Sequence, residues 1–353
     1  MTTKTHRKAF IWLLCLTSAY GAILTVITVM NWFGADNWWF GDLNLFLPQA
    51  IWVVPGVFLT IFYIKVNRRW VWVPLLGLAW VLGPIMGLCW PLHTSREPAN
   101  SLRIRVMTWN VKYGRQDALA PFELINNIDL IKPDVVLMQD AQGLLCGLLG
   151  DYFRKWNVQS SGQYIIASRL PLSDAEVRFI SFPGFKEKCL RCQMHIGTTV
   201  VTLYNVHFES PRDGLDAFKS LRQQPWYLPE AIQQLENNVY IRLFQARAIR
   251  EFISQEKGPV IVAGDFNSSD ASKVCITLRD AGLHDAFAEG GRGYGYTYGH
   301  YLLQHRLPWL RASWMRIDHI MISSQLQSRR SWTGTWQASA HRPVIADLLL
   351  KNP

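Results

Sequence analysis

The sequence predicts an α/β domain that follows a small bundle of membrane-spanning helices. Three long apolar stretches without a charged residue fill most of the first ninety residues. From Arg103 onward the pattern changes, and short runs rich in Val, Ile and Leu alternate with amphipathic stretches over about 250 residues. Strands mixed with helices over such a length favour sheets buried under helices. We therefore predict a membrane anchor over residues 1–95, a linker over residues 96–102 and an α/β domain over residues 103–353.

The composition supports this division. Of the 353 residues, 49% are hydrophobic and 16 are Trp, which is rich for a soluble enzyme and indicates a membrane part. The formal net charge is +10. Part of this excess lies in the anchor, so the α/β domain itself is only mildly basic. That balance permits a polyanionic partner but does not require one.

The three apolar stretches are Phe10–Met30, Leu45–Ile64 and Trp70–Trp90. Each has about the 20 residues that a helix needs to cross a hydrocarbon core. Prolines inside the second and third are tolerated within a helix bundle, and Trp residues lie mostly near the ends, as in an interfacial belt. A cleaved signal peptide would account for the first stretch alone. Buried helices of a soluble protein are the other alternative.

Basic residues predict the orientation of this anchor. Three of them precede the first stretch, none lies between Asn31 and Asn44, and three more separate the second stretch from the third. Because Lys and Arg favour the cytoplasmic side, the N-terminus is predicted to be cytoplasmic. Three spans then place the α/β domain outside the cytoplasm. We expect an integral, multi-pass protein of a bacterial inner membrane or a plasma membrane.

The α/β domain is expected to contain a series of short strands and at least two helices. Helical spacing of apolar residues indicates helices over Pro121–Ile131 and Leu235–Ile253. Strands are predicted, from their β-branched and apolar residues, over Arg103–Trp109, Val135–Met138, Tyr164–Ala167, Thr199–Val206, Val260–Ala263, Ile317–Ile322 and Val344–Leu350.

Six short polar motifs stand near the ends of these strands, and they carry the functional argument. Each places an acid, an amide or an imidazole beside an apolar run. Together they supply the carboxylates, amides and imidazoles that are needed to attack a phosphate ester with the help of a hard metal ion. The motifs are Thr108-Trp109-Asn110, Met138-Gln139-Asp140, Asn205-Val206-His207, Gly264-Asp265-Phe266-Asn267, Arg316-Ile317-Asp318-His319 and Ser339-Ala340-His341-Arg342-Pro343.

With these motifs in this order, the chain from Arg103 to Leu350 resembles the endonuclease/exonuclease/phosphatase superfamily, which has the DNase I-like fold. The resemblance implies a four-layer α/β sandwich, in which two mixed β-sheets lie face to face with helices outside. It also implies hydrolysis of phosphoester bonds, mostly with Mg²⁺. Members act on DNA, RNA, inositol phosphates, sphingomyelin or other phosphoesters.

Asp265 is the candidate general base under this resemblance. It ends an apolar run, and Gly264 before it allows close backbone approach. Asn267 follows two residues later, as the family requires. Asn267 and Asn110 would donate amide hydrogens to phosphoryl oxygens. The alternative for such residues is an ordinary turn or helix cap.

Two histidines would contact the phosphate, His207 and His341. Asp318 would hold His341 in one tautomer and favour its charged form. The alternatives are structural: a histidine packed in a strand, or an ion pair of Asp318 with Arg316 or Arg342.

Asp140 would be the principal metal ligand, with Asn110 beside it. The family usually has Glu at this position, and Asp is shorter by one methylene, about 1.5 Å of reach. Mg²⁺ is the expected ion, with Mn²⁺ as an alternative, since hard cations accept either carboxylate. An ordinary acid at a strand end is the competing interpretation.

Ala340 departs from the family pattern, which commonly has Asp before the last histidine. Three accounts are open: an active site with an altered metal geometry, a weak or inactive enzyme that binds phosphoesters, or a deliberate change that traps an inactive state. We favour the first, because Asp140 is a second change in the same site.

Two further features remain open. Cys189 and Cys192 form a single C-x-x-C, which lacks the second pair of a zinc site but could form a disulfide outside the cytoplasm. The stretches Glu209–Glu230 and Gly290–Met315 interleave aromatic and basic residues. Such loops suit stacked nucleobases, a membrane interface or simple local packing.

The leading hypothesis is a membrane-anchored, Mg²⁺-dependent phosphoesterase that acts on phosphodiesters at the outer face of the membrane, including phospholipid-type or lipid-linked ones. A membrane-tethered nuclease that acts on nucleic acid is the second hypothesis. A phosphoester-binding module without turnover is the third, because of Ala340. The expected partners are a phosphoester substrate and membrane lipids, and the sequence implies no protein partner.

Overall fold

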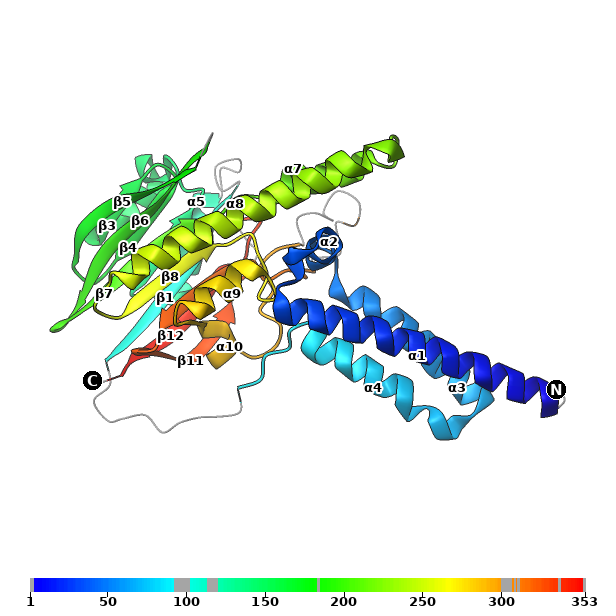
Figure 1. Ribbon diagram of the computed structural model, residues 1–353. Coiled ribbons are helices and arrows are strands. Elements are labelled where there is room, and N and C mark those ends of the chain that lie inside the picture. The colour runs from blue at the N-terminus through cyan, green and yellow to red at the C-terminus, as the bar shows by residue number, and fades with distance from the viewer. Residues whose placement is uncertain are drawn as a thin grey trace. The chain divides into compact units, whose positions relative to one another are not determined.

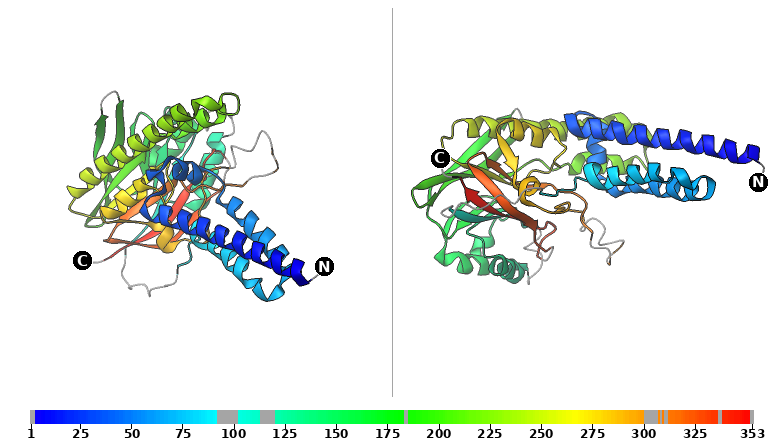
Figure 2. Two further views of the ribbon diagram at one scale, coloured as in Figure 1. Left: turned by 45° about the vertical axis from the view of Figure 1, so that its right-hand side comes forward. Right: turned by 90° about the horizontal axis from the view of Figure 1, so that it is seen from below.

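The computed structural model describes residues 3–91, 102–112, 120–182, 185–299, 307, 309, 312–335 and 338–351. The chain divides into two compact units, Met1–Leu88 with Ala271–Lys273, and Cys89–Asp270 with Val274–Pro353. Figures 1 and 2 show the helices of the first unit in blue to light blue, and the α/β second unit in colours that run from cyan through green and yellow to red. Each unit is described by itself.

The first unit is made of helices. Its apolar core takes residues from three of them, including Leu24, Tyr63 and Val81. The Tyr20 hydroxyl donates to the Trp52 carbonyl at 2.8 Å, and Trp80 Nε1 donates to the Thr28 hydroxyl at 2.9 Å. The elements are α1 (Thr3–Phe33), η1 (Ala35–Asn37), α2 (Trp39–Phe46), η2 (Gln49–Trp52), α3 (Val53–Val66), η3 (Arg68–Trp70), α4 (Trp72–Trp80) and the π-helical η4 (Val81–Ile85).

Two helices in the described part of the chain are long and apolar enough to cross a membrane, His6–Phe33 and Gln49–Val66. The prediction of three such helices is therefore confirmed only in part. The third stretch is helical but divided into η3, α4 and η4. Pro84 lies inside the π-helical turn. Proline removes a backbone donor and prevents a regular continuous helix, which explains why the third stretch does not form one long α-helix.

The second unit is built on two six-stranded sheets. Their orders are β11-β12-β1-β2-β4-β3 and β5-β6-β7-β8-β10-β9. Each sheet is mixed, since β1 pairs with β2 and β7 with β8 in parallel, while the other pairs are antiparallel. The strands are β1 (Arg103–Asn110), β2 (Val135–Gln139), β3 (Asn157–Ser161), β4 (Tyr164–Ser168), β5 (Leu172–Phe182), β6 (Phe185–Ile196), β7 (Thr199–His207), β8 (Val260–Asp265), β9 (Leu283–Asp285), β10 (Asp318–Ser323), β11 (Leu326–Thr333) and β12 (Val344–Leu350).

Helices accompany both sheets. The helical elements of the second unit are α5 (Ala120–Ile131), η5 (Leu144–Cys146), α6 (Leu148–Tyr152), η6 (Phe153–Lys155), α7 (Arg212–Ser220), η7 (Pro225–Tyr227), α8 (Leu228–Ser254), α9 (Lys273–Asp280) and α10 (Ala286–Gly290). Figure 1 shows α8 and α9 over the β7–β8 part of the second sheet.

Three apolar clusters define the layers of the sandwich. One cluster lies between the sheets and joins Val106 and Leu137 to Leu203 and Ile261. A second packs α5 against the outer face of the first sheet, and a third packs α8 and α9 against the outer face of the second. Because successive side chains of a strand point to opposite faces, both faces of the central strands are buried. The predicted four-layer sandwich of two mixed sheets flanked by helices is confirmed.

The predicted strands and helices are all present, with small shifts at their ends. Three of these shifts matter for the site, because β1 extends to Asn110, β8 extends to Asp265, and β10 begins at Asp318. Helix α8 begins at Leu228 rather than Leu235, with Pro at its first turn. The strands that the sequence did not predict, β3, β5, β6, β9 and β11, are mostly half polar or short.

Candidate active site

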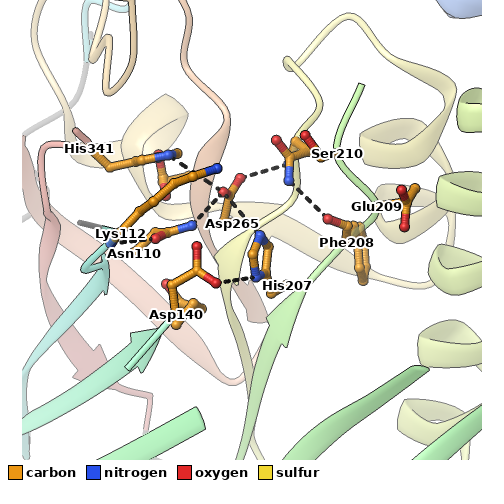
Figure 3. A network of polar contacts seen from close by, with 12 residues as sticks. Asn110, Lys112, Asp140, His207, Phe208, Glu209, Ser210, Asp265 and His341 are labelled. Carbon is orange, nitrogen blue, oxygen red and sulfur yellow. Dashed lines mark hydrogen bonds and ion pairs between the residues drawn. The ribbon is translucent and has the colours of Figure 1, made fainter. Parts of the chain in front are cut away.

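Strand pairing brings the six motifs to one edge of the sandwich. Within the first sheet Asn110 lies opposite Gln139, the residue before Asp140. Within the second sheet, Asp265 lies opposite His207 on one side and opposite Asp318 on the other. The strand ends of the two sheets thus collect the predicted side chains in one place (Figure 3).

Asp265 stands at the centre of this group. Its Oδ2 accepts a hydrogen bond from Asn110 Nδ2 at 2.9 Å, and its Oδ1 accepts one from the Asn267 backbone N–H at 2.9 Å. The Nε2 atoms of His207 and His341 lie 3.6 and 3.8 Å from Asp265 Oδ2. One carboxylate is therefore fixed by two amides and flanked by two imidazoles.

Gly264 is required by the backbone at this point. Its φ is +153°, and a Cβ built on it would lie 1.8 Å from the Val206 carbonyl oxygen. No other residue fits such an approach between neighbouring strands. The close approach expected from the sequence is present, and it sets the position of the next residue, Asp265.

The environment of Asp265 makes its carboxylate more basic than usual. Burial raises the pKa of Asp265, and the negative charge of Asp318 raises it further. His341, His207 and the N–H of Asn267 oppose this, but the net pKa is raised. A general base works best when its pKa approaches the operating pH. The direction of the shift therefore suits a residue that takes a proton from water.

His341 and Asp318 are hydrogen-bond partners. His341 Nδ1 lies 3.0 Å from Asp318 Oδ2, and Trp109 Nε1 donates to the His341 backbone carbonyl at 2.9 Å. Burial lowers the pKa of His341, but attraction to Asp318 and Asp265 outweighs burial, so its pKa is raised. A raised pKa favours the imidazolium, which can stabilise negative charge on a phosphoryl group.

The alternative ion pairs of Asp318 do not form. Arg316 instead lies 2.9 Å from Asp285 and also pairs with Asp270. The Nε of Arg342 donates to the Gly334 carbonyl at 2.8 Å. Asp318 therefore pairs with His341 rather than with either arginine. The Oδ1 atom of Asp318 has no hydrogen-bond partner among the described residues.

His207 is oriented by a residue that the sequence did not single out. Its Nδ1 lies 2.7 Å from Gln163 Oε1 and 3.8 Å from Asp140 Oδ1. Gln163 follows Gly162 in the turn between β3 and β4. No motif marks a glutamine in a hairpin turn, so only the folded sheet shows that it faces His207.

The residues expected to bind metal have a suitable donor set. Asp140 follows β2 with a φ of +53°, and its carboxylate is about one-third exposed. Figure 3 shows its side chain pointing toward Asn110 and Asp265. Asn110 Oδ1 accepts the Lys112 N–H at 2.9 Å and has a second lone pair. Carboxylate and amide oxygens are the ligands that a hard cation such as Mg²⁺ takes.

A second group near this point suits a metal less well. One ligand atom each from Asp265, Asp318 and His341 lies within 4.8 Å of the others. However, His341 and Asp318 are hydrogen-bonded to each other, and Asp265 accepts hydrogen bonds from two amide N–H groups. Their polar atoms are already used in hydrogen bonds that orient Asp265 and His341.

Two asparagines of the motifs, Asn267 and Asn205, hold the backbone around the site through hydrogen bonds. Asn267 Nδ2 donates to the Phe208 carbonyl at 2.9 Å, which uses one of its two amide hydrogens. Asn205 is buried between the sheets, where it donates to the carbonyls of Met138 and Ile165 and accepts from Gln139 Nε2. Asn205 therefore ties the first sheet to the second directly beneath the site.

Further residues at the site became visible only in the fold. The Ser339 hydroxyl donates to the Asn110 carbonyl at 2.6 Å and accepts from the His341 N–H at 3.1 Å, so it joins two motifs. The Tyr298 ring lies 4.5 Å from the His341 ring. Lys112 extends toward Asp265 and His341 (Figure 3), and its charge lowers the pKa of His341. A lysine two residues after Asn110 is the signal that could have identified it.

Ala340 is buried, with 2% of its surface exposed. Asp318 is the hydrogen-bond partner of His341, and Ser339 joins the segment before His341 to the end of β1 at Asn110. Neither task depends on an acid at position 340. In the chain, Ala340 lies between Ser339 and His341, which a hydrogen bond joins, and Ser339 also donates to the Asn110 carbonyl.

The two predicted specificity stretches are described in part. Within Glu209–Glu230, Trp226 and Tyr227 are exposed at the turn between α7 and α8. Within Gly290–Met315, the rings of Tyr294 and Tyr296 stack at 5.1 Å. The members that lie outside the described residues are His300, Tyr301, His305, Arg306, Leu310 and Arg311.

The cysteine pair is not bonded. Cys189 and Cys192 are both free thiols on β6, and burial raises the pKa of each to about 12. A thiol with such a pKa stays protonated and unreactive at neutral pH.

Several solved structures of other proteins share this fold. Humanized D. rerio TDP2 is 18% identical with a TM-score of 0.52, and the match covers 70% of this chain and 98% of that one. Truncated Caenorhabditis elegans TDP2 is 18% identical with a TM-score of 0.51 over the same shares. An endonuclease/exonuclease/phosphatase from Beutenbergia cavernae is 18% identical with a TM-score of 0.50, over 71% of this chain and 72% of that chain.

These likenesses show a shared fold. The sequence matches none of the curated proteins with which it was compared. A family model described as the Endonuclease/Exonuclease/phosphatase family matches residues 107–341, from the first motif to His341. The chain therefore belongs to the endonuclease/exonuclease/phosphatase family.

Proposed function

We propose that this protein is a membrane-anchored, divalent-metal-dependent phosphodiesterase. Family membership supports a hydrolase of the phosphodiesterase or nuclease class. The observation that carries the proposal is the buried Asp265, which two amides fix between His207 and His341. A carboxylate of raised pKa beside two imidazoles is the equipment for the attack of water on phosphorus.

Asp265 acts as the base in the proposed reaction. Water attacks the phosphorus while Asp265 accepts one of its protons, and a new P–O bond forms. The bond to the leaving oxygen breaks, and this oxygen keeps the electron pair and takes a proton from solvent. His341, charged and held by Asp318, stabilises the negative phosphoryl oxygens, with His207 and Lys112 near the same point. The remaining amide hydrogens of Asn110 and Asn267 are available to the same oxygens.

Asp140 and Asn110 would hold the metal ion. A Mg²⁺ ion there supplies positive charge against the phosphoryl oxygens, and Mn²⁺ is the alternative. Support comes from the oxygen donors of both residues and from the partly exposed Asp140 carboxylate.

The N-terminal unit acts as the anchor in this proposal. Only 22% of each of the two apolar windows is buried, so neither resembles the core helix of a soluble protein. Large apolar side chains of α1 face outward, among them Trp12 at 71% and Trp32 at 80% exposure. Lipid would cover this surface.

We further propose that the third apolar stretch crosses the membrane as well. The segments η3, α4 and η4 follow one another through Arg68–Ile85, and Val81 and Ile85 pack in the same core as α1 and α3. With three crossings and a cytoplasmic N-terminus, the catalytic domain lies outside the cytoplasm. A domain tethered there would reach phosphodiesters of phospholipid type in the outer leaflet.

A nuclease is the second candidate. It is favoured by the similar fold of D. rerio TDP2, whose crystal structure holds a single-strand DNA product. A nuclease would show binding that weakens steeply with salt, because phosphate contacts release counterions.

Turnover by the full chain in detergent micelles tests the proposal. The panel contains sphingomyelin-like lipids, glycerophospholipids, plasmid DNA, RNA and phosphomonoesters, each with Mg²⁺, with Mn²⁺ and with a chelator. We expect metal-dependent release from a phosphodiester lipid. Faster release from DNA would favour the nuclease. No turnover of any substrate with either metal would leave the phosphoester-binding module.

Reporter fusions after Pro353 test the topology. We expect an active phosphatase reporter and a dark cytoplasmic fluorescent reporter. The reverse pair of results would overturn the proposed topology, and it would remove access to the outer leaflet.

A further inference from the structure

A basic groove lies on the first sheet, away from the candidate active site. Its volume is about 420 Å³. Five basic residues and two acids are among its lining residues, which gives a net positive charge. The charged members are Arg103, Arg105, Lys132, Arg329, Arg330, Asp134 and Asp347. None of them belongs to the six motifs.

The groove opens on the outer face of the sheet. Ile104 and Val106 of β1 point into the core between the sheets, whereas Met107 packs against α5 on the outer side. Because side chains alternate along a strand, Arg103 and Arg105 also point outward. Helix α5 ends at Ile131, and the next residue, Lys132, takes a left-handed φ of +51°.

Three strands present the charges in a row. Asp347 of β12 lies opposite Arg105 of β1 on one side and opposite Arg330 of β11 on the other. The register of β11 shifts between Ser328 and Arg330. Such a bulge adds a residue and redirects side chains. Both Arg329 and Arg330 consequently line the groove.

Arg105 is held in place before any ligand arrives. Its Nε and Nη2 lie 2.6 and 3.0 Å from the two oxygens of Asp347, and its Nη1 donates to the Ile131 carbonyl at 2.7 Å. The guanidinium groups of Arg105 and Arg330 lie 5.3 and 4.7 Å from the centre of the Trp332 ring. A guanidinium fixed in this way loses little freedom when it binds an anion.

Both acids of the groove are already engaged. Asp347 is bound to Arg105, and Asp134 Oδ2 accepts the Arg105 backbone N–H at 2.7 Å. They neutralise part of the charge and leave an excess of three positive charges among the lining residues. Guanidinium forks and an ammonium group together match the oxygens of a phosphate. The volume suits a compact ligand rather than a long polymer.

We infer that this groove binds the phosphate group of a compact ligand, either a phospholipid headgroup or a soluble organic phosphate. Arg105 precedes Asn110 by five residues on the same strand, which is about 17 Å at the rise of an extended chain. The groove is therefore separate from the reacting centre. This inference does not rest on the proposed function, because it concerns binding and no bond is broken.

Calorimetric titration of the full chain in neutral detergent micelles tests the inference. The titrants are inorganic phosphate, glycerol phosphate, dihexanoyl phosphatidylglycerol and a single-stranded DNA oligomer. The test variant is the double change Lys132→Glu and Arg330→Glu. Its control is Arg154→Glu with Lys155→Glu, which makes the same change of charge at exposed residues outside the groove. The milder pair Lys132→Gln and Arg330→Gln serves if the first variant does not fold.

We expect the groove variant to bind phosphate compounds at least tenfold more weakly than wild type, while the control retains its affinity. Stronger binding of the phosphatidylglycerol would identify a lipid headgroup as the ligand, and equal binding of glycerol phosphate a soluble source. Turnover of bis(p-nitrophenyl) phosphate, where present, should be the same in all variants. Equal affinity of the groove variant and the control for every titrant would overturn the inference. So would tighter binding of the oligomer than of the compact phosphates through the same residues.

Discussion

The Nδ1 atom of His341 lies 3.0 Å from Oδ2 of Asp318, and this bond joins the last motif of the chain to the strand beside Asp265. Asp318 acts on both partners of the proposed chemistry. Its charge raises the pKa of His341 and the pKa of Asp265. One carboxylate therefore influences the protonation of both the proposed phosphate-binding acid, His341, and the proposed base, Asp265.

Asp318→Asn should move the whole pH profile of turnover to lower pH. Without the charge of Asp318, the pKa of Asp265 falls, so its carboxylate is deprotonated at lower pH. The pKa of His341 also falls, so the imidazolium loses its proton at lower pH and the alkaline limb moves in the same direction. The rate at the optimum should drop by about 10²-fold or more, as for loss of an acid–base contribution. A log rate against pH from 5 to 10 gives the measurement. A lower rate with unmoved limbs would show that Asp318 is only structural.

Asp265→Asn should abolish turnover and leave the fold intact. The change keeps the size of the side chain and removes the base, which typically contributes about 10²–10⁴-fold. Turnover and the thermal midpoint are measured together. Asp174→Asn is the matched control, because Asp174 is exposed on β5. Wild-type turnover in the Asp265 variant would remove Asp265 from the role of base.

The sequence predicted the central strands and the sandwich because the inner strands are continuous apolar runs. Val135–Gln139, Tyr164–Ser168 and Val260–Asp265 are buried along their whole length. Strands β5 and β6 were missed because they mix charged and apolar residues, as strands with a partly solvated face do. The prediction of three long helices was confirmed only in part, because composition does not show where a π-helical turn divides the third apolar stretch.

The motifs predicted the members of the site but not all of its supports. Asp265, His341 and Asp318 lie together because strand ends meet at one edge of each sheet. Gln163 and Lys112 lie outside the motifs, and Ser339 begins the last motif but was given no role in it. The contacts of all three depend on the course of a loop, which the sequence does not show. Asn205 was placed in a motif, yet its contacts are to the backbone of the facing sheet.

Ala340→Asp should leave unchanged or raise the Mg²⁺ concentration that gives half-maximal turnover. Ser339 ties this segment to the Asn110 carbonyl, so a new carboxylate enters beside a proposed metal ligand. Mg²⁺ is commonly bound by one or two carboxylates, and in a site compensated through Asp140 a second carboxylate would crowd the ion. Ala340→Asn has the same size without the charge and separates the effect of charge from that of size. A lower Mg²⁺ requirement in the Asp variant alone would indicate a site impaired by the missing acid.

Gly264→Ala should destabilise the catalytic domain by about 3 kcal/mol or more, a range reserved for severe backbone or packing conflicts. The added Cβ would meet the Val206 carbonyl, and neither strand can move without breaking its ladder. Gly197→Ala is the control, because its φ is +60° and nothing lies within 4 Å of its built Cβ. It should cost only about 1 kcal/mol, from left-handed backbone strain alone. Equal losses in urea unfolding would show that the close approach is not what requires Gly264.

The charged form of His319 should stabilise the domain, and this stabilisation should be lost as the pH rises from about 6.5 to about 10. Its Nδ1 lies 2.7 Å from an Asp285 oxygen and its Nε2 lies 2.9 Å from the Ser268 carbonyl. Both partners are acceptors, so both ring nitrogens must donate and the buried ring is an imidazolium. Burial lowers the pKa of His319, but Cys275 and Asp285 raise it, and the result is about 10.

Because the folded pKa lies above the ordinary value of 6.5, the stabilisation is complete below pH 6.5 and is lost as the pH rises toward 10. The loss is about 1.4 kcal/mol for each pH unit in that window. Thermal midpoints of the full chain in micelles at pH 7 and pH 9.5 should therefore fall further in wild type than in His319→Gln. His195→Gln is the matched control, because His195 Nε2 lies 2.7 Å from the Ser173 hydroxyl, a group that can donate as well as accept. The Ser268 carbonyl that His319 contacts lies three residues after Asp265, so turnover of His319→Gln should fall with its stability. Parallel pH curves for His319→Gln and wild type would show that the buried His319 ring is neutral.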